Sequence, residues 1–134
     1  MKEHTRTLYF EQINPFMKYN DIDELKTRFK KWTISVIILT RKLGFDPEYK
    51  AIRNQIARSA PSAAANYRSA CRAKSGADFI NKMKIVEEEL DESLFWLEII
   101  LELLPSLEND ITPIYQEGEE LLRISVASLR TARK

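Results

Sequence analysis

Four carboxylates in the second half of the chain have the spacing of a possible metal site. They stand at offsets of 0, 4, 11 and 15, which places them along one stripe of a helix: Glu87, Asp91, Glu98 and Glu102. Helical bundles hold di-metal centres when a Glu-x-x-His motif on each of two helices completes such a ligand set. The sequence has one histidine, His4, far from this stripe. We therefore interpret the stripe as a solvated or salt-bridged face, and we predict no metal and no cofactor.

The nucleophiles of the chain lack the partners that catalysis requires. The one cysteine, Cys71, has no second cysteine for a disulfide and no nearby histidine to act as a base. A small, packed thiol is the simpler interpretation of this residue. The single histidine also excludes a His-based catalytic triad and a His/Cys zinc site. The sequence therefore predicts no catalytic residues and no enzymatic activity.

The charges of the chain fall into two opposed blocks beneath a formal net charge of +1. Residues 50–84 hold 8 Lys and Arg against 1 acid, whereas residues 85–122 hold 12 Asp and Glu and no Lys or Arg. The basic block supplies candidate contacts to nucleic-acid phosphates. They are Arg53, Arg58, Arg68, Arg72 and Lys74. The alternative is that the basic block faces the acidic block of the same or a neighbouring subunit, and the sequence leaves both interpretations open.

Helical periodicity accounts for most of the chain, and no strand pattern is present. Apolar residues at helical spacing predict helices over residues 21–43, from Pro47 or Glu48 to the Ser75–Gly76 pair with a kink at Pro61, over 79–104, and over 110–131. Ser75 or Gly76 is available to cap the helix that follows this pair. Four amphipathic helices with short connections predict an all-α fold, an antiparallel up-and-down four-helix bundle. We assign residues 1–20 to an irregular N-terminal arm and 21–134 to one bundle domain. Without a signal-peptide pattern or a membrane-spanning segment, we expect a cytoplasmic protein.

The third predicted helix is apolar around most of its circumference. One set of residues forms a near-heptad seam for the bundle core: Phe79, Met83, Val86, Leu90, Leu94, Leu97, Leu101 and Leu104. A second set points elsewhere and predicts an interface between subunits: Phe95, Trp96, Ile99, Ile100 and Leu103. The alternative cover for this surface is the N-terminal arm, which carries Leu8, Tyr9, Phe10, Ile13 and Phe16. The pattern favours a homo-oligomer.

Several runs of residues together resemble the four-helix-bundle proteins that are encoded in intervening sequences of bacterial 23S rRNA genes. The runs are 55–60, 65–68, 71–75, 78–80 and 85–98, and the resemblance extends over about residues 22–130. Members of that family often carry Ser-x-Pro-x-Asn-x-x-Glu-Gly in the second helix. Here Ser62 and Asn66 match, but Ala64, Ser69 and Ala70 replace the Pro, Glu and Gly. A role for the missing Glu is therefore not carried over.

The resemblance implies a four-helix bundle without known catalytic activity that assembles into a ring, with a pentamer as the expected size. The family is similar to the accessory protein of diversity-generating retroelements, a pentamer that binds nucleic acid and a reverse transcriptase. We therefore expect a homo-oligomeric scaffold that binds structured RNA or DNA through the basic second helix. The alternative is a structural ring, or one that binds a second protein, without a nucleic-acid role.

Overall fold

The computed structural model describes residues 19–134, with side chains from Ile22 onward. Four long helices form an antiparallel bundle: α2 (Tyr19–Thr40), α3 (Pro47–Ala70), α4 (Gly76–Leu103) and α5 (Glu108–Ala132). A short 3-10 turn, η1 (Pro105–Leu107), precedes α5. This confirms the predicted all-α fold class. The predicted N-terminal arm, residues 1–20, lies outside the described residues except for its last two, which already belong to α2.

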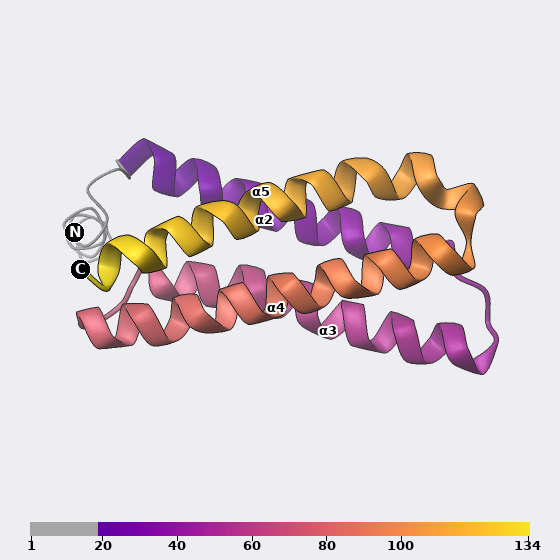
Figure 1. Cartoon of the computed structure of the whole chain (residues 1–134), viewed down its shortest axis with the longest axis horizontal. Coiled ribbons are helices and arrows are strands. Elements are labelled where there is room, and N and C mark those ends of the chain that lie inside the picture. The colour runs from indigo at the N-terminus through magenta and orange to yellow at the C-terminus, as the bar shows by residue number, and fades with distance from the viewer. Residues whose placement is uncertain (1–18) are drawn as a thin grey trace.

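The up-and-down order places three chain segments together at one end of the bundle (Figure 1). These are the start of α2, the connection between α3 and α4, and the end of α5. The connections after α2 and after α4 lie at the opposite end. Each helix contacts its two neighbours in the order α2, α3, α4, α5, and the α3–α4 contact is the most extensive. We call α2 with α3, and α4 with α5, the two layers of the bundle, and the extensive α3–α4 contact joins them. Among the described helices, none has the length and apolar character needed to cross a membrane.

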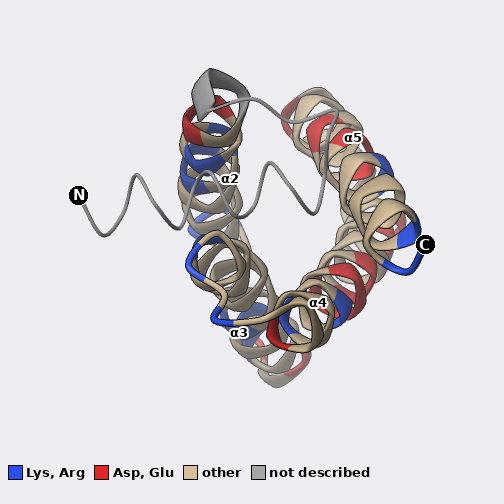
Figure 2. Ribbon diagram, turned by 90° about the vertical axis from the view of Figure 1, so that its left-hand side faces the viewer, with Lys and Arg blue, Asp and Glu red and all other residues tan. Residues whose placement is uncertain are grey.

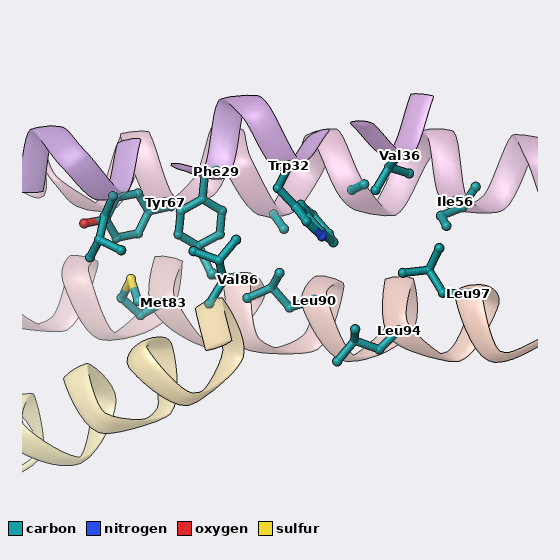
Figure 3. Close-up of a cluster of buried hydrophobic side chains, with 14 of the residues drawn as sticks. Phe29, Trp32, Val36, Ile56, Tyr67, Met83, Val86, Leu90, Leu94 and Leu97 are labelled. Carbon is teal, nitrogen blue, oxygen red and sulfur yellow. The ribbon is translucent and has the colours of Figure 1, made fainter. Parts of the chain in front are cut away.

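Aromatic residues of α2 meet small and aliphatic residues of α3 and α4 in the core (Figure 3). The ring of Phe29 stacks on Tyr67 of α3, with 4.5 Å between the ring centroids. Trp32 is buried, and its indole Nε1 donates a hydrogen bond of 3.0 Å to the carbonyl of Ile114 in α5. Cys71 is buried at the end of α3, as expected for a packed thiol. Burial, with Cys71 next to it, raises the pKa of the Tyr67 hydroxyl well above its usual value.

The helix ends differ from the predicted ones by a few residues, and hydrogen bonds explain the differences. After Thr40 the chain continues in short turns, so α2 ends three residues before the predicted position 43. Helix α3 runs through Pro61 without interruption and ends at Ala70, before the predicted Ser75–Gly76 break. Ser75 caps α4, because its hydroxyl accepts a hydrogen bond of 3.1 Å from the backbone N–H of Asp78. A predicted cap is thus confirmed.

The predicted core seam of α4 is correct up to Leu97 and changes beyond it. Ile100, expected outside the core, is 1% exposed, whereas Leu101 and Leu104 are only partly buried. Phe79, Val86, Ser93 and Ile100 follow one strict seven-residue repeat, and all four are buried. The predicted seam leaves this repeat after Leu90, so it included Leu101 and omitted Ile100. The prediction that Ile100 points away from the core is wrong.

Gly118 in α5 occupies a crowded point between three helices. A methyl group at its Cα would lie 2.9 Å from Leu94 Cδ2 and 3.2 Å from Trp32 Nε1. Both distances are shorter than ordinary van der Waals contacts between such atoms. The glycine therefore lets α5 approach α2 and α4 closely, at a cost of about 1 kcal/mol in helix propensity relative to alanine.

Candidate nucleic-acid interface

A groove follows the exposed side of the contact between α2 and α3. It has a volume of about 880 Å³, and small residues of α3 form its floor: Pro61, Ala64 and Ala65. Lys26, Lys30 and Arg68 line it together with one acid, Asp23. Small side chains let two helices approach while leaving little bulk above the contact. The alanine-rich stretch of α3 therefore creates a shallow groove with a basic rim.

A second hollow lies where α3 turns into α4. Arg68, Arg72, Lys74 and Lys82 line it, together with Asp78. The carboxylate of Asp78 accepts hydrogen bonds from Lys82 Nζ at 2.8 Å and from the backbone N–H of Lys74 at 3.0 Å. These two bonds, with the Lys82 bond the larger cause, lower the pKa of Asp78. The one acid of this hollow is thus paired with a lysine of its own helix.

Arg68 lines both the groove and the hollow, so the two are parts of one continuous surface. We call the set Lys26, Arg68, Arg72 and Lys74 the basic surface. It joins residues of α2, α3 and the α3–α4 connection at one end of the bundle. Three of the five arginines and lysines that the sequence predicted as phosphate contacts belong to it.

Arg53, a fourth predicted contact, is hydrogen-bonded within the subunit. Its Nη2 donates hydrogen bonds to the carbonyl oxygens of Leu43 at 3.1 Å and Gly44 at 2.8 Å. Carbonyl groups after a helix end have no partner within the helix and need one elsewhere. Arg53 supplies it for the chain that leaves α2, at the end of the bundle opposite to the basic surface.

Arg58, the fifth predicted contact, pairs with acids of the neighbouring helix. Its guanidinium bonds Glu89 at 2.9 Å and also contacts Glu92, both in α4. The charge of Glu89 is the main cause of a raised pKa of Arg58. Arg58 of the basic block therefore meets two acids of the acidic block within a single subunit. This is part of what the second interpretation of the charge blocks expected.

The two layers of the bundle have opposite net charge. The α2–α3 layer with its connections, residues 19–75, holds 12 Lys and Arg and 5 Asp and Glu, a net charge of +7. Residues 76–134, the α4–α5 layer, hold 6 and 13, a net charge of −7. In a view along the bundle, basic residues follow α2 and the α3–α4 connection, and acidic residues colour much of α4 and α5 (Figure 2). The charge asymmetry of the sequence is therefore also a spatial asymmetry.

Lys26 and Lys30 were missed by sequence reasoning, because they precede the basic block that the charge count outlined. Their spacing of four residues places them on one face of α2, and this was the available signal. Only the packing of α2 against α3 shows that this face adjoins Arg68.

The predicted interface residues of α4 have different environments. Phe95 is 50% exposed and Leu103 is 48% exposed, while Trp96 and Ile99 are partly buried. The rings of Phe95 and Trp96 meet edge to face at 5.0 Å. Ile100 lies in the core of the subunit, as described above. An apolar surface around Phe95, Ile99 and Leu103 therefore remains uncovered by the residues that the structure describes.

The four carboxylates of the acidic stripe, Glu87, Asp91, Glu98 and Glu102, all lie on α4. Within residues 22–134, no group of three or more His, Cys, Asp or Glu side chains is arranged to hold a metal ion. Glu98 instead accepts a hydrogen bond of 3.3 Å from the Tyr115 hydroxyl of α5. Burial is the main cause of a raised pKa of Tyr115, and the charge of Glu98 adds to it.

These features define an α-helical bundle of two oppositely charged layers with a basic surface at one end. Residues 23–127 match the model of the 23S rRNA-intervening sequence protein family. The match extends over most of the chain, and the protein therefore belongs to this family. The resemblance that its sequence motifs indicated is thereby confirmed.

A solved structure has the same fold. It is a crystal structure at 1.70 Å of a protein of unknown function from the S23 ribosomal protein family of Bacteroides thetaiotaomicron VPI-5482. Its chain is 26% identical to this one, with a TM-score of 0.72, and the similarity covers 79% of this chain and 98% of the other. No curated protein matches the sequence.

Proposed function

We propose that the protein is a non-enzymatic, homo-oligomeric scaffold that binds the phosphate backbone of structured RNA or DNA through the basic surface. The observation that carries this proposal is the position of Arg68, which joins Lys26 of α2 to Arg72 and Lys74 beyond α3 in one surface. Contacts to phosphates supply affinity that does not depend on base sequence and falls as salt rises. A surface of lysines and arginines beside a groove lined in part by small residues is suited to such contacts.

Family membership is consistent with this proposal but does not identify a ligand. The family is described by the rRNA genes in which its members are encoded, and the similar solved structure is of a protein of unknown function. The proposal therefore rests on the charge and position of the four residues of the basic surface.

Binding of an RNA hairpin across a salt series tests the nucleic-acid part of the proposal. We expect binding at low salt, with an affinity that decreases steeply as salt rises, measured by fluorescence anisotropy. Each phosphate contact contributes about 0.7–0.9 to the slope of log K against log salt. Replacing Arg68 and Arg72 together by Ala should therefore reduce the slope by about 1.4–1.8.

Lys50→Ala is the matched control. Lys50 is exposed on the same helix, 18 positions before Arg68, and therefore about 27 Å away along α3. This variant should bind like the unmodified protein. Absence of binding at low salt would overturn the proposal, as would equal losses from Lys50→Ala and Arg68→Ala.

A second candidate function is a ring that binds only protein, and the exposed apolar residues favour it. Besides Phe95 and Leu103, α2 exposes Ile34 and Ile38 to nearly half of their full area. Exposed apolar patches of this kind mark contacts between proteins. Self-association without RNA binding would support this candidate. Light scattering on the full chain measures the assembly, which both candidates expect to be larger than one subunit.

A further inference from the structure

The exposed face of α2 and the exposed face of α4 carry the same spacing of residue types with opposite charge. On α2, Lys30 is followed by isoleucine at the fourth and eighth positions and arginine at the eleventh: Ile34, Ile38 and Arg41. On α4, Asp91 is followed by apolar residues at the fourth and eighth positions and glutamate at the eleventh: Phe95, Ile99 and Glu102. Each residue of the first set precedes its counterpart by 61 positions. We call these sets the α2 strip and the α4 strip.

Both strips are open to solvent in the isolated subunit. The apolar residues Ile34, Ile38 and Phe95 are 48%, 47% and 50% exposed, and Ile99 is partly buried. The four charged residues that flank them are exposed. Two residues of the α2 strip, Lys30 and Ile34, also line the groove described above. Helix positions four apart lie on one face. Each strip is therefore an apolar centre with one charge beyond each end.

The two strips lie at nearly the same level along the bundle. Thr33 of α2 donates a hydrogen bond to the carbonyl of Ala60 in α3 at 3.5 Å. The neighbouring Ser59 lies 2.7 Å from the hydroxyl of Ser93 in α4. Thr33 and Ser93 therefore lie at similar positions along the bundle axis. They are 60 residues apart in the sequence, and corresponding residues of the two strips are 61 apart. With a rise of 1.5 Å per residue, the strips differ in level by roughly 3 Å.

We propose that the α2 strip of one subunit packs against the α4 strip of a second copy of the same chain. In an up-and-down bundle α2 and α4 run in the same direction. Two copies in the same orientation therefore align the strips position by position, with Lys30 at Asp91, Ile34 at Phe95, Ile38 at Ile99 and Arg41 at Glu102. This inference rests on the homo-oligomer of the proposed function and names the surfaces that form it.

The charges make the contact directional. Opposite charges flank the apolar centre when an α2 strip meets an α4 strip, whereas two α2 strips or two α4 strips would place like charges together. Like-charge contacts suppress wrong pairings and fix the register of an interface. The two strips lie on different helices of a subunit. Each subunit can therefore bind one neighbour through its α2 strip and another neighbour through its α4 strip. Contacts of this kind close into rings or extend into filaments. Because the two strips lie at nearly the same position along the bundle axis, neighbouring subunits lie side by side rather than end to end.

Two single substitutions and their mixture test this pairing. Ile38→Glu places an acid in the α2 strip, which faces the acidic α4 strip of the neighbour. Phe95→Lys places a cation in the α4 strip, which faces the basic α2 strip of the neighbour. Either change buries a charge at the contact, and we expect each to weaken assembly at least about 100-fold. Each variant alone should therefore have the mass of one subunit in light scattering. An equimolar mixture should form a species of two chains, since one intact strip of each kind remains.

Ile85→Glu is the matched control. Ile85 is an exposed isoleucine of α4 that lies outside the α4 strip, ten residues before Phe95. Its assembly should equal that of the unmodified protein. Circular dichroism of all variants shows whether the helical fold is retained. The proposed contact is wrong if Ile38→Glu or Phe95→Lys retains the full assembly, or if either alone forms a two-chain species. An unmodified protein that stays monomeric at all concentrations contradicts the homo-oligomer itself.

Charge exchange tests the register. Lys30→Glu alone should weaken assembly by roughly tenfold, since it places like charges together at the rim of the contact. Adding Asp91→Lys in the same chain should restore assembly, because the parallel alignment pairs these two positions. Adding Glu102→Lys instead should not restore it. Restoration by Glu102→Lys and not by Asp91→Lys would mean that the strips pack in the opposite direction and would overturn the proposed arrangement.

Discussion

The α2–α3 layer and the α4–α5 layer differ by 14 units of formal charge, since they carry +7 and −7. Their interiors are nevertheless alike, because both contribute uncharged side chains to one core. Three cations of the basic layer form ion pairs with acids of the other layer: Arg28 with Glu117, Lys42 with Asp110, and Arg58 with Glu89 and Glu92. Apolar packing therefore joins the layers, and these ion pairs between partly exposed side chains add to it.

The layers also differ in the kind of surface that they expose. The α3 side of the basic layer presents small residues beneath a basic rim, at Pro61, Ala64 and Ala65. The α4 side of the acidic layer presents large apolar residues, Phe95 and Leu103, beside acids. The first surface suits a charged chain that lies in a groove. The second suits a packed protein contact.

Removing a core aromatic residue from the basic layer should have the largest effect on stability. Phe29→Ala deletes the ring that stacks on Tyr67 and leaves a cavity between α2, α3 and α4. Such a change costs about 3–5 kcal/mol of unfolding free energy. Urea denaturation measures it. Phe45→Ala is the control, because Phe45 is 97% exposed and should change stability by no more than about 0.5 kcal/mol. Similar losses in both variants would contradict a core that joins the layers.

Filling the close contact at Gly118 should have the next largest effect. Gly118→Val adds a branched side chain where Leu94 and the indole of Trp32 already meet the helix. Overpacking of this kind costs about 1–3 kcal/mol. Gly118→Ala should cost less, because the Leu94 methyl group that lies nearest can move and alanine favours the helix by about 1 kcal/mol. A thermal melt of the two variants distinguishes them, and a Val variant as stable as the Ala variant would contradict the close approach.

A double-mutant cycle on Arg28 and Glu117 should show a smaller effect. The two side chains form a bidentate pair, with distances of 3.0 and 2.7 Å, and each is about one-third exposed. The bond to Glu117 is the main cause of a raised pKa of Arg28. Replacing each by Ala, separately and together, should give a coupling free energy of about 0.5–1 kcal/mol that decreases in high salt. A coupling above about 3 kcal/mol would mean that ion pairs, rather than packing, join the layers.

The smallest effect should be a dependence of stability on pH that comes from Asp78. The bonds from Lys82 and from the Lys74 backbone lower the pKa of Asp78 in the folded protein. A carboxyl group with a lowered pKa stabilises the fold above its ordinary pKa of about 3.9, and this contribution disappears as pH falls through the lowered value. The stability difference between the unmodified protein and Asp78→Asn should therefore be present at neutral pH and shrink in acid. A difference that grows in acid would contradict this sign.

Local patterns in the sequence predicted the helices with small errors. The start of α3 at Pro47 and the cap at Ser75 depend on residues next to them, and both were predicted. The interior position of Ile100 was not, because the predicted seam left the strict seven-residue repeat that the buried residues of α4 follow, and that repeat is selected by how α4 packs against its neighbours. Helix ends shifted where a distant side chain, such as Arg53 after α2, supplies hydrogen bonds.

The candidate site was only partly predictable for a related reason. Charge counting identified Arg68, Arg72 and Lys74, but it also included Arg53 and Arg58 and missed Lys26. The difference among these cations is which group each one meets, and the partners of Arg58 lie 31 and 34 positions along the chain.

The sequence by itself thus determined four amphipathic helices, one bundle and two opposed blocks of charge, because each of these follows from residue types within a few turns of helix. The tertiary structure decided which cations pair within the subunit, that α2 joins α3 in the basic surface, and that the α2 and α4 strips share a level. These relations depend on the rotation and relative height of packed helices. Both are set by contacts between residues that are far apart in the chain.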